Sequence, residues 1–179
     1  PKMKELFPDQ LADVDEMMFY RAIHKAQPSL IRTEADELSY CLHIMVRYEL
    51  EKRIFAGELE VKDLPAEWNR MYKEYLGVDV PSNKKGVLQD SHWSGGNIGY
   101  FPSYALGSAI AAQLFHYMET KMPVKKYLSE GNLTPIREFL RENIHQYGAA
   151  KKTQQLLMDT TGEEFNPDYL DSLDDSFDD

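Results

Sequence analysis

The chain concentrates chemically capable side chains in one short segment, residues 86–107, GVLQDSHWSGGNIGYFPSYALG. Asp90 and His92 are two residues apart there, and a carboxylate within reach of an imidazole can form a base or a proton-donor pair. A glycine-rich stretch, 95–99, comes next, and glycine lets the backbone approach a ligand closely. The segment therefore predicts part of a binding cleft, although a loop histidine held by Asp90, with Trp93 packed beneath it, explains the same residues.

Two tyrosines, Tyr100 and Tyr104, lie where the next helix is expected to start, one turn apart. Side chains at i and i+4 share a helix face, so both hydroxyls are expected to face one cleft. A phenol in such a position can donate a hydrogen bond to a developing oxyanion.

Arg32 is the second candidate, because it opens an expected long helix, 32–57, directly after a break at residues 27–29. A guanidinium can hold a carboxylate through two parallel hydrogen bonds, and a helix N-terminus adds partial positive charge that also favours an anion. The competing interpretation is an ordinary helix start, in which nearby acidic residues complement the helix dipole: Glu34, Asp36 and Glu37.

The other histidines and the cysteine show no such grouping. Each of the histidines lies on an expected helix face and is predicted to be structural, because none forms an HxxxH, HExxH or CxxC pattern. They are His24, His43, His116 and His145. Cys41 falls on the apolar face of the 32–57 helix with no activating neighbour, so we expect it to be core. No metal site is therefore expected in this chain.

Composition limits the classes of protein to consider. With 179 residues, 42% hydrophobic and 28% charged, the chain is typical of one globular domain. A net charge of -10 argues against nucleic-acid binding, and no apolar run is long enough to cross a bilayer. One cysteine fits a reducing compartment, and the N-terminus lacks the apolar segment of a secretory signal, so we expect a cytoplasmic protein.

Hydrophobic periodicity predicts an all-α fold. Apolar residues recur at helical spacing in seven segments: 11–26, 32–57, 65–76, 103–121, 124–129, 135–147 and 150–161. No strong period-two pattern occurs, which leaves room for one short strand or hairpin near 59–63 or 86–93. The apolar stripe expected on the 32–57 helix is Leu38, Cys41, Leu42, Met45, Val46 and Leu50. Residues 1–165 are expected to form one helical part, and the carboxylate-rich segment 166–179 an acidic tail or a short docked helix.

Two strings carry a resemblance to a known family. IRTEADELSYCLHIMVRYELEK is similar to the I/V-R-x-x-A-D segment of the thermostable carboxypeptidase (Taq-type) family of zinc metallocarboxypeptidases. GVLQDSHWSGGNIGYFPSYALG resembles the G-x-x-Q-D-x-H-W segment of that family together with the residues directly C-terminal to it. The likeness extends from about residue 15 to about residue 170, and two long motifs in the right order are more specific than either alone.

The resemblance implies a helical metallopeptidase fold with a cleft, related to neurolysin and angiotensin-converting enzyme. It implies removal of C-terminal amino acids from peptides by a cytoplasmic homodimer that uses zinc or cobalt. By the same resemblance, Arg32 would hold the terminal carboxylate of the substrate, and His92 with Tyr100 or Tyr104 would contact the substrate backbone or the oxyanion. Asp90 would orient His92, and Gln89 would hydrogen-bond nearby backbone.

One departure from the family pattern is decisive for what the chain alone can do. The sequence contains no HExxH, H-P-F or D-x-R-x-T segment. A catalytic zinc needs about three protein ligands and an open position for water. We therefore expect a C-terminal portion of such an enzyme, holding substrate-binding residues, binding no metal and inactive alone. The alternative is a non-enzymatic helical interaction protein derived from the same fold.

Overall fold

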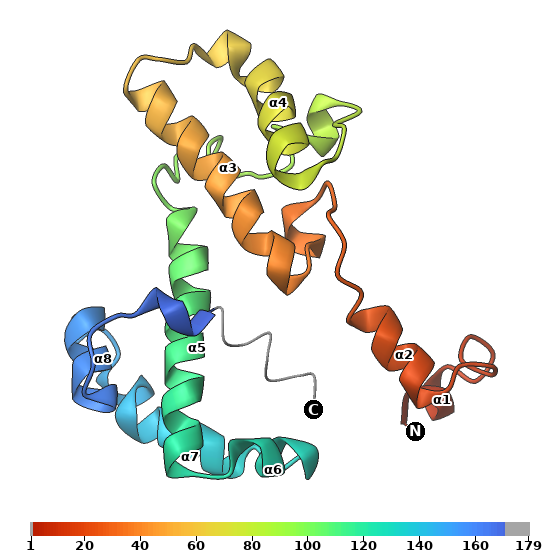
Figure 1. Cartoon of the computed structure of the whole chain (residues 1–179), viewed down its shortest axis with the longest axis vertical. Helices are drawn as coiled ribbons and strands as arrows, with labels where there is room; N and C mark the ends of the chain where they lie inside the picture. Colours follow the sequence, from red (N-terminus) through yellow and green to blue (C-terminus); the bar gives the residue numbers. More distant parts are fainter. Residues whose placement is uncertain (1, 171–179) are drawn as a thin grey trace. The chain divides into compact units, whose positions relative to one another are not determined.

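The computed structural model describes residues 2–170, and every regular element in them is a helix (Figure 1). The chain divides into two compact units, Pro1–Pro102 and Ser103–Asp179. The predicted all-α class is therefore confirmed. The short strand or hairpin has no counterpart in the described part, because residues 61–63 form a 3₁₀ turn and 86–93 form irregular turns. Residues 171–179 of the predicted acidic segment lie outside the description.

The first unit contains four α-helices joined by irregular segments and three 3₁₀ turns. Its elements are α1 Lys2–Leu6, α2 Glu16–Ile23, η1 Arg32–Glu34, α3 Glu37–Phe55, η2 Val61–Asp63, α4 Leu64–Leu76 and η3 Asn83–Lys85. The helix predicted over 11–26 is shorter, because the Asp15 carboxylate caps α2 by accepting from Met18 N–H at 2.7 Å.

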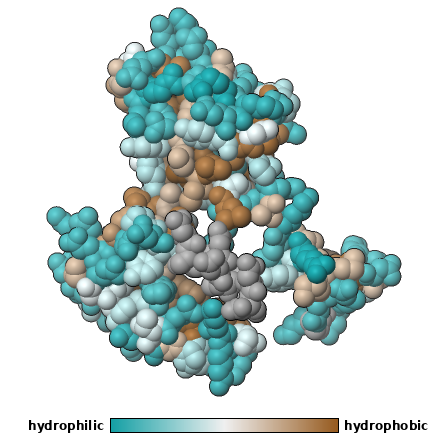
Figure 2. All heavy atoms as spheres, in the orientation of Figure 1, coloured by the Kyte–Doolittle hydropathy of each residue, from teal (hydrophilic) through white to brown (hydrophobic). Residues whose placement is uncertain are grey.

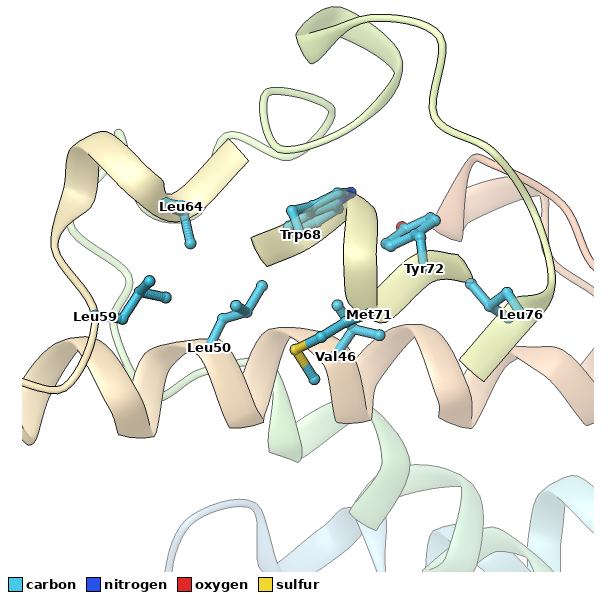
Figure 3. Close-up of a cluster of buried hydrophobic side chains, with 8 residues drawn as sticks. All are labelled: Val46, Leu50, Leu59, Leu64, Trp68, Met71, Tyr72 and Leu76. Atoms are coloured by element: carbon cyan, nitrogen blue, oxygen red, sulfur yellow. The ribbon is translucent and has the colours of Figure 1, made fainter. Parts of the chain in front are cut away.

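The hydrophobic core of the first unit lies between α3 and α4 (Figure 3). Helix α4 begins with a proline in its first turn and ends at Gly77, whose φ of 70° makes it a left-handed cap. Its inward face places Trp68 and Tyr72 against Val46 and Leu50 of α3, and the Trp68 and Tyr72 rings stack at 4.9 Å. Helices α3 and α4 are called the α3–α4 hairpin below. Residues of the segment 86–101 pack against its core. Asp63, at the N-cap position of α4, makes no side-chain capping bond.

The long helix predicted over 32–57 is interrupted. Arg32 to Glu34 form a 3₁₀ turn, Ala35 is extended, and α3 begins only at Glu37. The cause is Asp36, whose carboxylate accepts from Ser39 N–H at 2.9 Å and from Gln27 N–H at 2.9 Å. An N-cap at this position gives the chain a new direction, so that Arg32 lies outside the helix it was expected to open.

The buried face of α3 is largely polar, contrary to the predicted apolar stripe. Leu38 and Met45 are 57% and 48% exposed, although Val46 and Leu50 are buried as expected. Four polar side chains spaced four residues apart, hereafter the polar stripe of α3, are buried instead: Ser39, His43, Arg47 and Glu51. Burial of such groups is tolerated only when they find hydrogen-bond partners, and most of these partners come from α4 and from residues 89–99.

The second unit is built around α5 Pro102–Lys121, which starts at the last residue of the first unit. It also contains α6 Val124–Ser129, α7 Thr134–Asn143, η4 His145–Tyr147 and α8 Thr153–Thr161. Gln113 of α5 is 1% exposed. Its side chain donates to Glu164 O at 2.8 Å and accepts from Asn166 N–H at 3.0 Å. One buried amide therefore holds the segment after α8 against α5.

The helices lack the character of membrane spans. Figure 2 shows hydrophilic residues over most of the visible face of the α3–α4 hairpin. Among residues 2–170, no helix is both long and apolar enough to cross a membrane.

Candidate functional site

Asp90 lies between two arginines from different elements of the first unit. Its Oδ1 accepts from Arg32 Nε at 3.0 Å and Nη2 at 2.7 Å, and its Oδ2 accepts from Arg47 Nε at 2.7 Å. The Asp90 side chain is 10% exposed, so the two ion pairs are shielded from water. Burial raises the pKa of Asp90, but the hydrogen bonds and charges of the two guanidiniums outweigh it and hold the pKa below its usual value.

Gln89 joins the segment before Arg32 to this site. Its Oε1 accepts from the Arg32 backbone N–H at 2.9 Å, and its Nε2 donates to Leu30 O at 3.0 Å. The same Nε2 lies 3.2 Å from Lys85 O and 3.2 Å from the Tyr72 hydroxyl. The predicted hydrogen bonds of Gln89 to nearby backbone are confirmed, and they fix the position from which Arg32 reaches Asp90.

The Tyr72 hydroxyl connects this site to His43. It lies within hydrogen-bond distance of Arg47 Nη1 at 3.3 Å and Gln89 Nε2, both of which can only donate. The hydroxyl proton is therefore directed to His43 Nδ1, 3.1 Å away, which places the imidazole proton on Nε2. Burial, assisted by the nearby charges of Arg47 and Arg32, lowers the pKa of His43 to about 4. His43 is therefore a buried neutral histidine at physiological pH, and the structural role predicted for it agrees with this geometry.

His92 is held among aromatic rings beside the same carboxylate. Its ring centroid lies 4.5 Å from that of Phe101 and 5.8 Å from that of Tyr100. His92 Nδ1 and Asp90 Oδ1 are 3.9 Å apart, which is too long for a hydrogen bond. Asp90 gives its short contacts to the two arginines, and the orienting of His92 by Asp90 stays a prediction.

Glu51 fixes the loop that carries His92. Its carboxylate accepts from Trp93 Nε1 at 2.6 Å and from Gly99 N–H at 3.1 Å. The Trp93 ring packs edge-on against Trp68 at 6.0 Å and against Phe101 at 5.8 Å, which agrees with the predicted packing of Trp93 beneath the loop. Gly99 has a φ of 72°, a conformation that favours glycine, at the residue whose N–H meets Glu51.

The two candidate tyrosines do not belong to the same helix. Tyr100 precedes α5 and is 51% exposed beside His92, whereas Tyr104 lies on α5 in the second unit. The expectation that both stand on one helix face, one turn apart, is therefore wrong, because α5 begins only at Pro102.

Arg32 and His92 share neighbours in the first unit, and a cleft between them stays a prediction. The Arg32 guanidinium carbon lies 5.7 Å from the Phe101 ring, which also contacts His92, and both side chains approach Asp90 Oδ1. Arg32 is 5% exposed, and its Nη1 donates to the Tyr40 hydroxyl at 2.9 Å. Although burial lowers the pKa of Arg32, its bonds to Asp90 and Tyr40 outweigh this effect and raise it, so the guanidinium stays charged.

Sequence reasoning missed several members of the site, and above all Arg47. Arg47 is 0% exposed and makes the second ion pair with Asp90. A signal was present in the four-residue spacing of the polar stripe of α3, which marks one helix face. The partners that this face draws from other elements lie 25 to 48 positions away in the sequence, so the pattern alone did not identify them.

The chemistry of the site suits the binding of an anion. Two buried guanidiniums with a carboxylate between them, beside an imidazole and aromatic rings, favour a bound carboxylate. Within residues 2–170 no three His, Cys, Asp or Glu side chains are grouped so that they could hold a metal ion.

Comparisons with known proteins find one family of relatives. Residues 1–177 match the family model described as Carboxypeptidase Taq (M32) metallopeptidase. The chain is 48% identical over 170 residues to Carboxypeptidase 1 of Bacillus subtilis and 43% identical over 164 residues to Thermostable carboxypeptidase 1 of Thermus thermophilus. These alignments cover 94% and 91% of this chain. The BsuCP crystal structure superposes with a TM-score of 0.93 at 47% identity over 97% of the chain.

The chain spans about a third of the length of these relatives. It covers 34% of the Bacillus protein, 32% of the Thermus protein and 35% of the BsuCP chain. The similarity nevertheless extends over nearly all of this chain, in both sequence and backbone, and includes both quoted motifs. The chain therefore belongs to the carboxypeptidase Taq (M32) family of metallopeptidases, and it corresponds to about one third of the length of the relatives that it matches.

Proposed function

We propose that this chain is the substrate-binding portion of a metal-dependent carboxypeptidase that removes C-terminal amino acids from peptides. The observation that carries the proposal is the convergence of Arg32 and His92 on Asp90 and Phe101, in a chain of this family. An exopeptidase must recognise the charged end of its substrate, and a guanidinium in a water-poor site is suited to a carboxylate.

The roles proposed for the residues follow the family resemblance, and their positions in the first unit support them. Arg32 binds the terminal carboxylate, Gln89 holds the backbone of Arg32 in place, and Asp90 pairs with the Arg32 guanidinium while no substrate is bound. His92 and Tyr100, which lie side by side, contact the peptide backbone or the developing oxyanion. Tyr104 is an alternative to Tyr100 for this last role.

The metal belongs to the polypeptide outside these 179 residues in this proposal. Zinc or cobalt would supply polarisation of the scissile carbonyl and a nucleophilic water. Because the described residues offer no set of ligands, the chain alone is expected to be inactive. Support for a larger parent comes from α1 and α2, which contain no buried residue and expose large apolar side chains such as Leu6, Met17 and Ile23. A cytoplasmic homodimer is proposed for the complete enzyme.

The proposal is tested on the protein made from the complete gene that encodes this chain. A blocked dipeptide with a free C-terminus and the same dipeptide as a C-terminal amide serve as substrates. We expect hydrolysis of the free acid only. Arg32→Met should raise KM by about 100-fold, because removing one partner of a buried charge pair costs about 3 kcal/mol.

The matched control is Arg70→Met, which removes an exposed arginine of α4 that pairs with Glu67 and Glu74. It should leave KM unchanged. Equal hydrolysis of acid and amide, or an unaltered KM in Arg32→Met, would refute the role of the guanidinium. A metal-dependent activity in the isolated 179-residue chain would refute the assignment of the metal to other polypeptide.

A further inference from the structure

The two arginines that share Asp90 are not equivalent. Arg47 projects from α3, is 0% exposed, and directs its Nη1 to His43 O at 2.7 Å and to the Tyr72 hydroxyl. Arg32 projects from a 3₁₀ turn and meets the other oxygen, Oδ1. Each arginine thus pairs with a different oxygen of Asp90, and the Arg47 side is anchored to the helical hairpin.

The cluster contains two guanidiniums and two carboxylates. Arg32 and Arg47 both pair with Asp90. Glu51, one turn beyond Arg47 on α3, directs its oxygens to Trp93 Nε1 and Gly99 N–H. A guanidinium can exchange one carboxylate partner for another, so Arg32 could pair with the carboxylate of a ligand in place of Asp90.

We infer that Arg47 is a positioning residue for substrate binding: it keeps Asp90 paired while Arg32 transfers hydrogen bonds from Asp90 to the terminal carboxylate of a peptide. The inference rests on the proposed function and adds a residue that acts through others. Without Arg47, a substrate carboxylate that took the Arg32 guanidinium from Asp90 would leave the Asp90 carboxylate unpaired in a buried site. With Arg47 on Oδ2, Asp90 keeps one guanidinium while the substrate carboxylate takes the other.

The inference predicts a specific defect when Arg47 is removed. In Arg47→Met, Asp90 loses one guanidinium and keeps that of Arg32, so releasing Arg32 to a substrate becomes costly. KM for a free-acid dipeptide should rise by about tenfold or more, while kcat changes little, because Arg47 does not touch the reacting atoms. A purely structural role of Arg47 would lower the amount of active enzyme and leave KM unchanged.

A second substitution provides the rescue. Asp90→Asn in the Arg47→Met background removes the carboxylate that competes for Arg32, so KM should return towards that of the wild type. The matched control is Arg53→Met, which removes a partly exposed arginine of the same helix that pairs with Glu67 outside the cluster. It should change neither KM nor kcat.

The experiment measures KM and kcat for the blocked dipeptide with the protein from the complete gene. If Arg47→Met does not fold, Arg47→Lys, which keeps the charge but cannot make the same paired contact, should show a smaller rise in KM. A wild-type KM in both Arg47 variants, or a double variant no better than Arg47→Met, would overturn the inference and leave the proposed function intact. A wild-type enzyme that does not distinguish free acid from amide would overturn both.

Discussion

His43 makes the stability of the first unit depend on pH between its folded and unfolded pKa values. Its pKa in the folded chain is about 4, against 6.5 for an unperturbed histidine. Above pH 6.5 the imidazole is neutral in both states and contributes nothing. As the pH falls below 6.5, the unfolded chain binds a proton that the folded chain excludes, until the pH reaches about 4. The free energy of unfolding should therefore fall by about 3 kcal/mol across this window.

The assay is urea unfolding of the 179-residue chain at several pH values between about 7 and about 4, for the wild type and His43→Gln. The glutamine is neutral throughout and can accept the Tyr72 hydrogen bond through its Oε1. The free energy of unfolding of the wild type, relative to that of His43→Gln, should fall by about 1.4 kcal/mol per pH unit below about pH 6. His24→Gln, at an exposed histidine of the same unit, serves as the control for losing one histidine. Parallel pH profiles for the wild type and His43→Gln would refute the buried neutral state.

Three further substitutions test the packing and the ion pairs. Asp90→Asn should lower the free energy of unfolding by about 3 to 5 kcal/mol, because it leaves two buried guanidiniums without their shared anion; urea midpoints measure this, and an unchanged midpoint would contradict it. Trp68→Ala, at a side chain 1% exposed, should cost about 3 to 5 kcal/mol by emptying the centre of the α3–α4 core, which thermal unfolding detects. Gln113→Leu should cost about 1 to 3 kcal/mol and speed hydrogen exchange at Asn166 N–H, because that amide loses its acceptor; unaltered exchange would show that the segment after α8 is held otherwise.

Helices with a clear apolar face and clear end signals were predictable from the sequence. The ranges 65–76, 103–121 and 124–129 agree with α4, α5 and α6 to within one residue at each end. Proline in the first turn and glycine after the last turn mark the limits of α4 by local chemistry alone. Such helices need no knowledge of the rest of the fold.

The region around α3 was less predictable, because distant residues decide it. Asp36 was interpreted as a charge complementing a helix dipole, whereas its carboxylate caps α3 and binds Gln27 N–H. The apolar-stripe rule then selected Leu38 and Met45, which are exposed. The rule fails where buried polar groups have partners elsewhere, and α3 is such a helix.

The candidate site was found in part. Arg32, Gln89, Asp90 and His92 do lie together in the first unit. The sequence could not indicate that Arg47 shares Asp90, because an arginine in the middle of a helix is usually a solvated residue. The sequence therefore indicated most of the side chains of the site, but it did not indicate which of them pair across the fold.

The polar stripe of α3 also constrains how this sequence can change over generations. Ser39, His43, Arg47 and Glu51 each bond a different side chain, so a replacement at one position leaves a polar group unmatched on the other side. Effects of mutations in contact with one another do not add, so acceptable replacements here must arrive as compensating pairs. Neutral drift along this helix is consequently expected to be slow on its inward side and fast on its outward side.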